Sequence, residues 1–236
     1  MNEKLIIEYK NKKIANALEI LKNKVNEKNI KEAANFHFKN KTSNNFQNYY
    51  SKILLNQIYY FSNGNFFGEF KSKYSLQGID NNCLNNFETR KTEIIELIEM
   101  NDLVTLYFSH FADRKIKSKK KEVRKDLDSF YTKFVHTFLP EKYPPLDNPI
   151  KNMLGFKKES FIFSFFCIAE LYSSFAKENA SLVKRIKEIF KNSETQKFSD
   201  MKLIDLVLWK EADTLKKKEE KINKYKQHSK IILKEK

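Results

Sequence analysis

All four prolines of the chain lie close together, at Pro140, Pro144, Pro145 and Pro149. Proline cannot continue a helix beyond its first turn, and it disfavours a helical conformation in the residue before it. Long helices are therefore excluded here but permitted on both sides. The chain also holds only 4 glycines, too few for an all-β sandwich, which needs a turn about every ten residues. This distribution predicts a mainly α, multi-helix bundle.

Apolar residues recur at helical spacing over most of the chain. The pattern predicts helices at about 4–34, 46–58, 87–100, 103–111, 123–139, 159–177 and 182–190, and one from 200 onward.

These helices are expected to form a single helical domain over residues 1–236. A loop near 64–86 could separate two lobes, 1–80 and 81–215, followed by a basic tail at 216–236. An Asn-Gly pair flanked by aromatic residues allows at most one short β-hairpin, near 59–74.

Positive charge is in large surplus, with 45 Lys and Arg against 30 Asp and Glu and a net charge of +15. Such a surplus attracts polyanions, of which nucleic acid is the commonest. The densest basic segment, 113–126, predicts either a solvated loop leading into a helix or a strip that contacts phosphates. The predicted nucleic-acid-binding residues are Arg114, Lys115, Lys117, Lys119, Lys120, Lys121, Arg124, Lys125 and Lys133. Abundant Lys, Asn and Ile also suggest AT-rich coding, which would inflate lysine without any partner.

Several classes of site are not predicted. Cys83 and Cys167 are far apart in apolar surroundings, which indicates free buried thiols and a cytoplasmic protein. The histidines lack metal-ligand spacing and the glycines form no nucleotide-binding fingerprint, so we expect no metal and no cofactor. No signal peptide is visible, and the most apolar run, 161–176, is too short to span a bilayer. A membrane partner is therefore not expected.

The proline stretch predicts a helix, a rigid connector and a second, capped helix. Pro140 ends the first helix, and Pro144 and Pro145 impose an extended path. Asp147 or Asn148 can then cap a short helix that holds Pro149 in its first turn. Aspartates in this position are mostly helix caps, and a catalytic role for Asp147 is the alternative.

The same residues carry a resemblance. The stretch "FVHTFLPEKYPPLD" at 134–147 resembles the region around the essential aspartate of helix-hairpin-helix DNA glycosylases. In addition, "KFVH" at 133–136, "YPPLD" at 143–147 and "IDLVLW" at 204–209 are similar to motifs of bacterial helical proteins related to that fold. The resemblance implies DNA rather than RNA as partner and a bacterial or phage origin. It also implies that Asp147 is catalytic, stabilising a sugar cation or orienting an attacking water or amine.

Three hypotheses about function follow. The glycine-containing hairpin of the superfamily should fall near 118–129, where this chain has no glycine. This departure favours a nucleic-acid-binding protein related to the glycosylase fold but without base-excision activity. The first alternative is an active DNA glycosylase or related nucleic-acid enzyme that uses Asp147. The second alternative is a non-enzymatic helical module that binds a protein partner through the aromatic N-terminal half.

Overall fold

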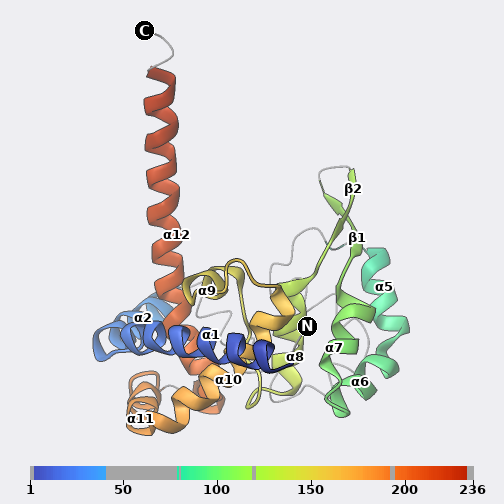
Figure 1. Ribbon diagram of the computed structural model, residues 1–236, viewed down its shortest axis with the longest axis horizontal. Coiled ribbons are helices and arrows are strands. Elements are labelled where there is room, and N and C mark those ends of the chain that lie inside the picture. Colours follow the sequence, from blue (N-terminus) through green and yellow to red (C-terminus); the bar gives the residue numbers. More distant parts are fainter. Residues whose placement is uncertain (1–2, 41–78, 80, 119–120, 192–194, 233–236) are drawn as a thin grey trace.

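The structure is a computed structural model that describes residues 3–40, 79, 81–118, 121–191 and 195–232. Within these ranges the chain is mainly helical with one two-stranded antiparallel sheet, which confirms the predicted fold class (Figure 1). The elements are α1 (Glu3–Lys24), α2 (Glu27–Lys39), α5 (Asn81–Thr89), α6 (Lys91–Glu99), α7 (Leu103–Leu106), the π-helix η1 (Tyr107–Phe111), β1 (Arg114–Ser118), β2 (Lys121–Lys125), α8 (Asp128–Phe138), α9 (Asn148–Met153), α10 (Phe161–Glu178), α11 (Ala180–Ile189), the 3₁₀ turn η2 (Thr195–Lys197) and α12 (Asp200–Ile232).

The N-terminal helices pack against the C-terminal ones. The continuous helix expected at 4–34 is interrupted after α1, because Asn26 caps a new helix by accepting a hydrogen bond from the Asn29 amide. Helix α1 lies on α10, and α2 lies against α11 and α12. The Phe-rich face of α10 is buried at the centre, with Phe165 and Phe175 inaccessible to solvent.

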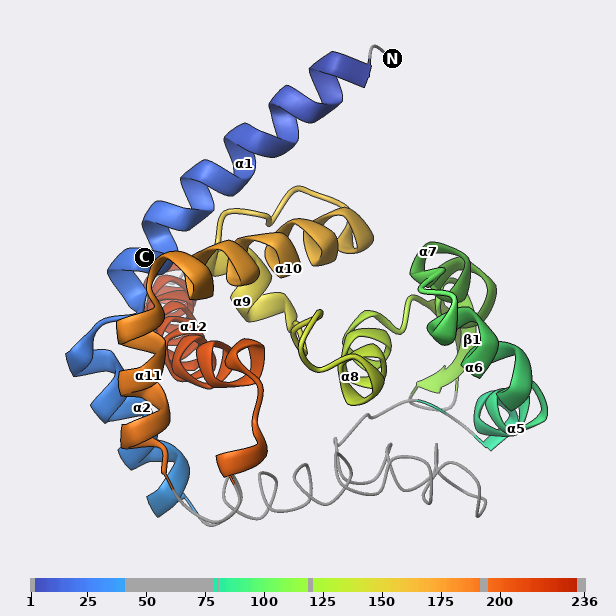
Figure 2. The ribbon, with the colours of Figure 1, turned by 90° about the horizontal axis from the view of Figure 1, so that it is seen from below.

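A second group of helices, α5, α6, α7 and η1, lies on the far side of α8 from α9 and α10 (Figure 2). Aromatic side chains join this group to α8. The Phe111 ring of η1 stands 5.5 Å from Phe130 and 5.3 Å from Tyr131, both in edge-to-face geometry. Phe87 of α5 completes the cluster, 5.1 Å from Phe111. Such pairs stabilise a core beyond their area of contact.

The basic segment forms a β-hairpin, so the predicted loop leading into a helix is wrong. Each strand carries one apolar, β-branched residue at its centre, with Ile116 opposite Val123. Such residues suit a strand, whereas the same lysines on a helix would repel one another at three- and four-residue spacing. Helix α8 consequently begins at Asp128 and does not include Val123. The hairpin predicted at 59–74 lies outside the described residues.

Helix α12 begins as predicted, with the Ser199 hydroxyl accepting a hydrogen bond from the Lys202 amide at 3.1 Å. Its first turns are buried from Met201 to Leu208. The helix then leaves the body of the molecule and projects well beyond it (Figure 1). Its 33 residues correspond to a length of about 50 Å at 1.5 Å per residue.

Candidate nucleic-acid interface

The hairpin places cations directly opposite one another on its two strands. In the antiparallel register Arg114 pairs with Lys125, and Lys115 pairs with Arg124. Like charges in such positions repel, so a sequence selected only for hairpin stability would avoid them. Lys115, Arg124 and Lys125 are all exposed. The strands therefore concentrate positive potential on a thin, accessible element, the basic hairpin (residues 114–118 and 121–125).

Two of the basic side chains hold the root of the hairpin in place. The Arg114 guanidinium donates from Nε to the Ala112 carbonyl at 2.9 Å and from Nη2 to the Ser109 carbonyl at 2.5 Å. Arg114 thus binds carbonyl groups at the end of the π-helix. Arg124 forms an ion pair with Asp113, although its side chain remains 64% exposed. The predicted phosphate contacts are therefore not equivalent, because Nε and Nη2 of Arg114 are committed to main-chain carbonyls.

The remaining predicted residues divide into three groups. Lys117 and Lys121 lie on the strands near the turn, and Lys119 and Lys120 lie outside the described residues. Lys133 lies in α8, away from the hairpin, and its side chain is only 13% exposed. The structure therefore brings Arg114, Lys115, Arg124 and Lys125 together and separates Lys133 from them.

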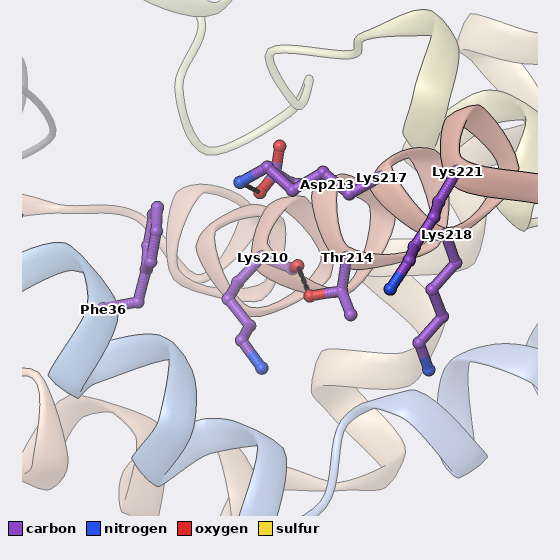
Figure 3. A pocket seen from close by; sticks show the side chains of 7 residues that line it. All are labelled: Phe36, Lys210, Asp213, Thr214, Lys217, Lys218 and Lys221. Carbon is purple, nitrogen blue, oxygen red and sulfur yellow. Dashed lines mark hydrogen bonds and ion pairs between the residues drawn. The ribbon is translucent and has the colours of Figure 1, made fainter. Parts of the chain in front are cut away.

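A second basic surface lies on α12, and the sequence indicated it only as a lysine-dense tail. A shallow cavity of about 350 Å³ is bordered by Phe36 and by Lys210, Lys217, Lys218 and Lys221. In Figure 3 the ammonium groups of Lys210, Lys218 and Lys221 lie on one side of the helix, and Lys217 turns towards Asp213. Lys210 pairs with Glu32 at 2.6 Å. Lys218 and Lys221 have no acidic partner in the part of the chain that the structure describes.

The basic hairpin and the projecting part of α12 extend from the same side of the molecule, one at each end of it (Figure 1). The view from below in Figure 2 also keeps them apart. They are separated by about ninety residues of sequence, from Lys125 to Lys217. We refer to the basic hairpin and the part of α12 that carries Lys217, Lys218 and Lys221 together as the two basic arms.

Asp147 occupies the expected N-cap position of α9, with Pro149 in the first turn, but its carboxylate makes no capping hydrogen bond. It instead forms an ion pair with the Lys133 ammonium and accepts a hydrogen bond from the Ser129 hydroxyl at 2.8 Å. Burial alone would raise the pKa of Asp147, but Lys133 and Ser129 outweigh it and hold the pKa below its usual value. About a quarter of the carboxyl side chain, 24%, remains exposed. The prediction that Asp147 lies at the N-cap of a helix is thus correct, but the prediction that its side chain caps that helix is wrong.

A second ion pair, Lys202–Asp205, interacts electrostatically with the Lys133–Asp147 pair. Lys202 and Asp205 of α12 are buried, with Nζ 3.4 Å from Oδ2. Burial raises the pKa of Asp205, and the Lys202 ammonium offsets only part of this effect. The Lys202 ammonium also lowers the pKa of Asp147, the acid of the first pair. Buried ions are costly unless they are matched, so this arrangement of two cations and two anions fixes how α8, α9 and α12 meet.

His136 completes the buried polar group. Its Nδ1 lies 2.5 Å from the Tyr143 carbonyl in the proline connector, so the ring nitrogen donates to that carbonyl. This contact fixes the connector against α8. Trp209 is likewise packed against the core, with its ring 5.7 Å from that of Phe36.

Cys83 and Cys167 are buried and form no disulfide among the described residues, as predicted. Among the described residues, no helix is long and apolar enough to cross a bilayer, and no cluster of three or more His, Cys, Asp or Glu has the geometry of a metal site. Comparisons with protein-family models, curated protein sequences and solved structures find no significant match to this chain. The arms and the Lys133–Asp147 pair are therefore interpreted from their own geometry.

Proposed function

We propose that this protein binds nucleic acid through its two basic arms, with double-stranded DNA as the favoured partner. The observation that carries the proposal is the opposition of like charges in the basic hairpin, Arg114 to Lys125 and Lys115 to Arg124. Contacts within the protein, such as the Arg124–Asp113 ion pair, offset part of this repulsion, and a polyanion bound along the hairpin would offset more of it. The lysines of α12 add positive potential on the same side of the molecule, at the end away from the hairpin.

The shape of the hairpin favours DNA over RNA. A two-stranded ribbon fits the major groove of B-form DNA, whereas the major groove of an A-form RNA helix is too deep and narrow to admit it. Lys115, Arg124 and Lys125 would then contact the phosphates that border the groove. Lys and Arg contacts of this kind give affinity and orientation without sequence preference.

The test is DNA binding measured across a range of salt concentration. We expect fluorescence anisotropy with a labelled duplex to show that log K falls linearly with log salt concentration. Replacing Lys115, Arg124 and Lys125 together with Ser should reduce this slope by about 2–3, because each phosphate contact contributes about 0.9. An RNA duplex of the same length should bind more weakly.

A matched control removes the same charge elsewhere. Lys177, Lys184 and Lys191 are exposed near the C-terminal end of α10 and along α11, away from both arms. Their joint replacement with Ser should leave the salt slope close to that of the unmodified protein. An equal reduction of the salt slope in both variants would show that only net charge matters. Binding that does not depend on salt would refute the proposal. The latter result would favour the protein-interaction module instead.

One observation supports a second candidate function, an enzyme acting on DNA. The Lys133 ammonium lies against a partly exposed Asp147 carboxylate, in the stretch that resembles helix-hairpin-helix glycosylases. An aspartate so placed could stabilise a developing sugar cation while a water or amine attacks. The test is incubation with duplexes that carry damaged or mismatched bases, followed by alkaline cleavage of abasic sites. Asp147→Asn should abolish such activity while circular dichroism shows a folded protein; activity that survives the substitution would exclude Asp147 as the catalytic group.

A further inference from the structure

A polar cavity of about 440 Å³ opens between α5, α6 and the π-helix η1, at the root of the basic hairpin. Its volume lies in the range of small-molecule sites. Four side chains that can bind an anion or accept a proton border it: Arg90, Glu93, His110 and Arg114. Of the residues in the two arms and the Lys133–Asp147 pair, only Arg114 borders this cavity.

His110 is the least satisfied group in the cavity wall. Its side chain is only 5% exposed, and Nε2 has no hydrogen-bond partner among the described residues. Glu93 Oε1 lies 3.3 Å from Nε2, a distance suited to an ion pair, although the contact does not meet hydrogen-bond geometry. Burial lowers the pKa of His110 despite the nearby carboxylate, so the ring is neutral at physiological pH. A neutral ring with its proton on Nε2 can donate a hydrogen bond to a ligand that enters the cavity.

The position of His110 in a π-helix supports a role for it in ligand binding. Single π-turns are rare and are frequently found at functional sites, because the wider turn changes the direction of one side chain. Here the π-helix covers Tyr107–Phe111, and Arg114 fixes its end by binding the carbonyls of Ser109 and Ala112. These bonds leave Nη1 of Arg114 without a partner in the described part of the chain, held in a rigid plane beside the cavity.

The charges favour an anionic ligand. Arg90 and Arg114 outnumber the single carboxylate, Glu93, which pairs with Arg90 at 3.0 Å. The side chain of Arg90 is 62% exposed, so it can turn to a ligand without unfolding its helix. Two guanidinium groups and an imidazole N–H border one cavity, and such donors suit the oxygens of a phosphoryl group. Glu93 and Asn86 remain to bind the hydroxyl groups of an attached sugar.

We propose that this cavity binds a phosphoryl group together with its attached sugar, supplied either by a free nucleotide or by the end of a nucleic-acid strand. Arg90, Arg114 and His110 bind the phosphoryl oxygens, and Glu93 accepts from the sugar. The inference goes beyond the two arms, because the cavity uses only Arg114 of the hairpin and none of the phosphate-contacting lysines proposed above.

The test uses isothermal titration calorimetry with adenosine 5′-monophosphate, adenosine, and a short single strand with and without a 5′-phosphate. We expect saturable binding of adenosine 5′-monophosphate and none of adenosine. Tighter binding of the 5′-phosphorylated strand than of the nucleotide identifies a strand end as the source, and the reverse order identifies a free nucleotide. Either order supports the site.

Arg90→Gln should weaken binding of the preferred probe at least tenfold, and His110→Gln should weaken it as well. Arg185→Gln is the matched control, because Arg185 is also an exposed arginine paired with glutamates, Glu27 and Glu188, but lies in α11. It should leave the affinity unchanged. The inference is overturned if no phosphate-bearing probe binds saturably, if acetate competes as well as phosphate, or if Arg185→Gln has the same effect as Arg90→Gln. The variant lacking Lys115, Arg124 and Lys125 should still bind adenosine 5′-monophosphate, so failure of the arms and failure of the cavity give different results.

Discussion

Two buried histidines should make this protein sensitive to acid. Burial, aided by repulsion from Lys202, lowers the pKa of His136 to about 3, although its hydrogen bond to the Tyr143 carbonyl acts in the opposite direction. Burial likewise lowers the pKa of His37 to about 4, despite the Leu206 carbonyl 3.0 Å from its Nε2. Both rings are therefore neutral in the folded protein at pH values where an unfolded histidine, with a pKa near 6.5, is protonated.

The sign and size of the effect follow from proton linkage. The pKa of each histidine is lower in the folded protein than in the unfolded chain. Each therefore contributes fully to the free energy of unfolding above pH 6.5, and this contribution is lost as the pH falls, because the unfolded chain then takes up a proton that the folded protein does not. From pH 7 to pH 5 each histidine should lower the free energy of unfolding by about 1.9 kcal/mol, or about 4 kcal/mol for the two together. Asp205 acts in the opposite sense, since its raised pKa favours the folded state as the pH falls. A comparison of variants removes this contribution.

The informative variant is His136→Asn, whose amide can still donate to the Tyr143 carbonyl but cannot titrate. Urea denaturation at pH 7, 6 and 5 should show it less stable than the unmodified protein at pH 7, with the difference shrinking by about 1.9 kcal/mol at pH 5. The control is Thr132→Val, which removes a buried hydrogen bond to the Leu146 carbonyl of the same connector and no titrating group. Its deficit should not change with pH. A constant deficit for His136→Asn would refute the argument that this ring is neutral when folded.

Three further predictions concern stability, each measured by urea denaturation at pH 7. Lys133→Met and Asp147→Asn should each lower the free energy of unfolding by about 2–3 kcal/mol, because each leaves one member of the pair uncompensated; a double variant that loses the full sum would show that the two groups do not interact. Gly155→Ala should cost about 1 kcal/mol, since Gly155 adopts φ +86° after α9, a conformation that alanine reaches only with strain; no change would indicate that the turn can relax. Ser199→Ala should cost about 1 kcal/mol through loss of the N-cap of α12, and Ser199→Asp should restore it.

Features set by local sequence could be predicted. The Phe-rich helix α10, the cap at Ser199 and the helix start at Asp147 all depend on residues within a few positions of one another. Periodicity and capping rules act over that distance. The basic hairpin could not be predicted from the pattern of apolar residues. Each five-residue strand holds a single apolar residue, Ile116 or Val123, and one residue defines no period.

The candidate sites depend on contacts that no local rule contains. Lys133 and Asp147 are 14 positions apart and meet only because the prolines turn the chain back onto α8. The cavity joins Arg90, the N-cap of α6, and Glu93 of α6 to His110 of the π-helix through packing of the aromatic cluster. Sequence could identify Asp147 as well placed and the 113–126 segment as basic. It could not identify the partner of Asp147 or the burial of His110, because both depend on how helices pack.

The buried ion pairs also determine how the two arms are held relative to each other. Helix α8 begins three residues after β2 ends, and the Leu127 amide binds the Phe111 carbonyl, so the hairpin and α8 share a root. Lys133 of α8 binds Asp147, and this pair acts electrostatically on Lys202 in the first turn of α12. Because an unmatched buried charge is costly, movement of one helix against the other is opposed at this point. The hairpin and α12 are thus connected through one buried polar cluster, so under the proposed function a duplex that bridges the two arms would meet cations at a spacing fixed by the core.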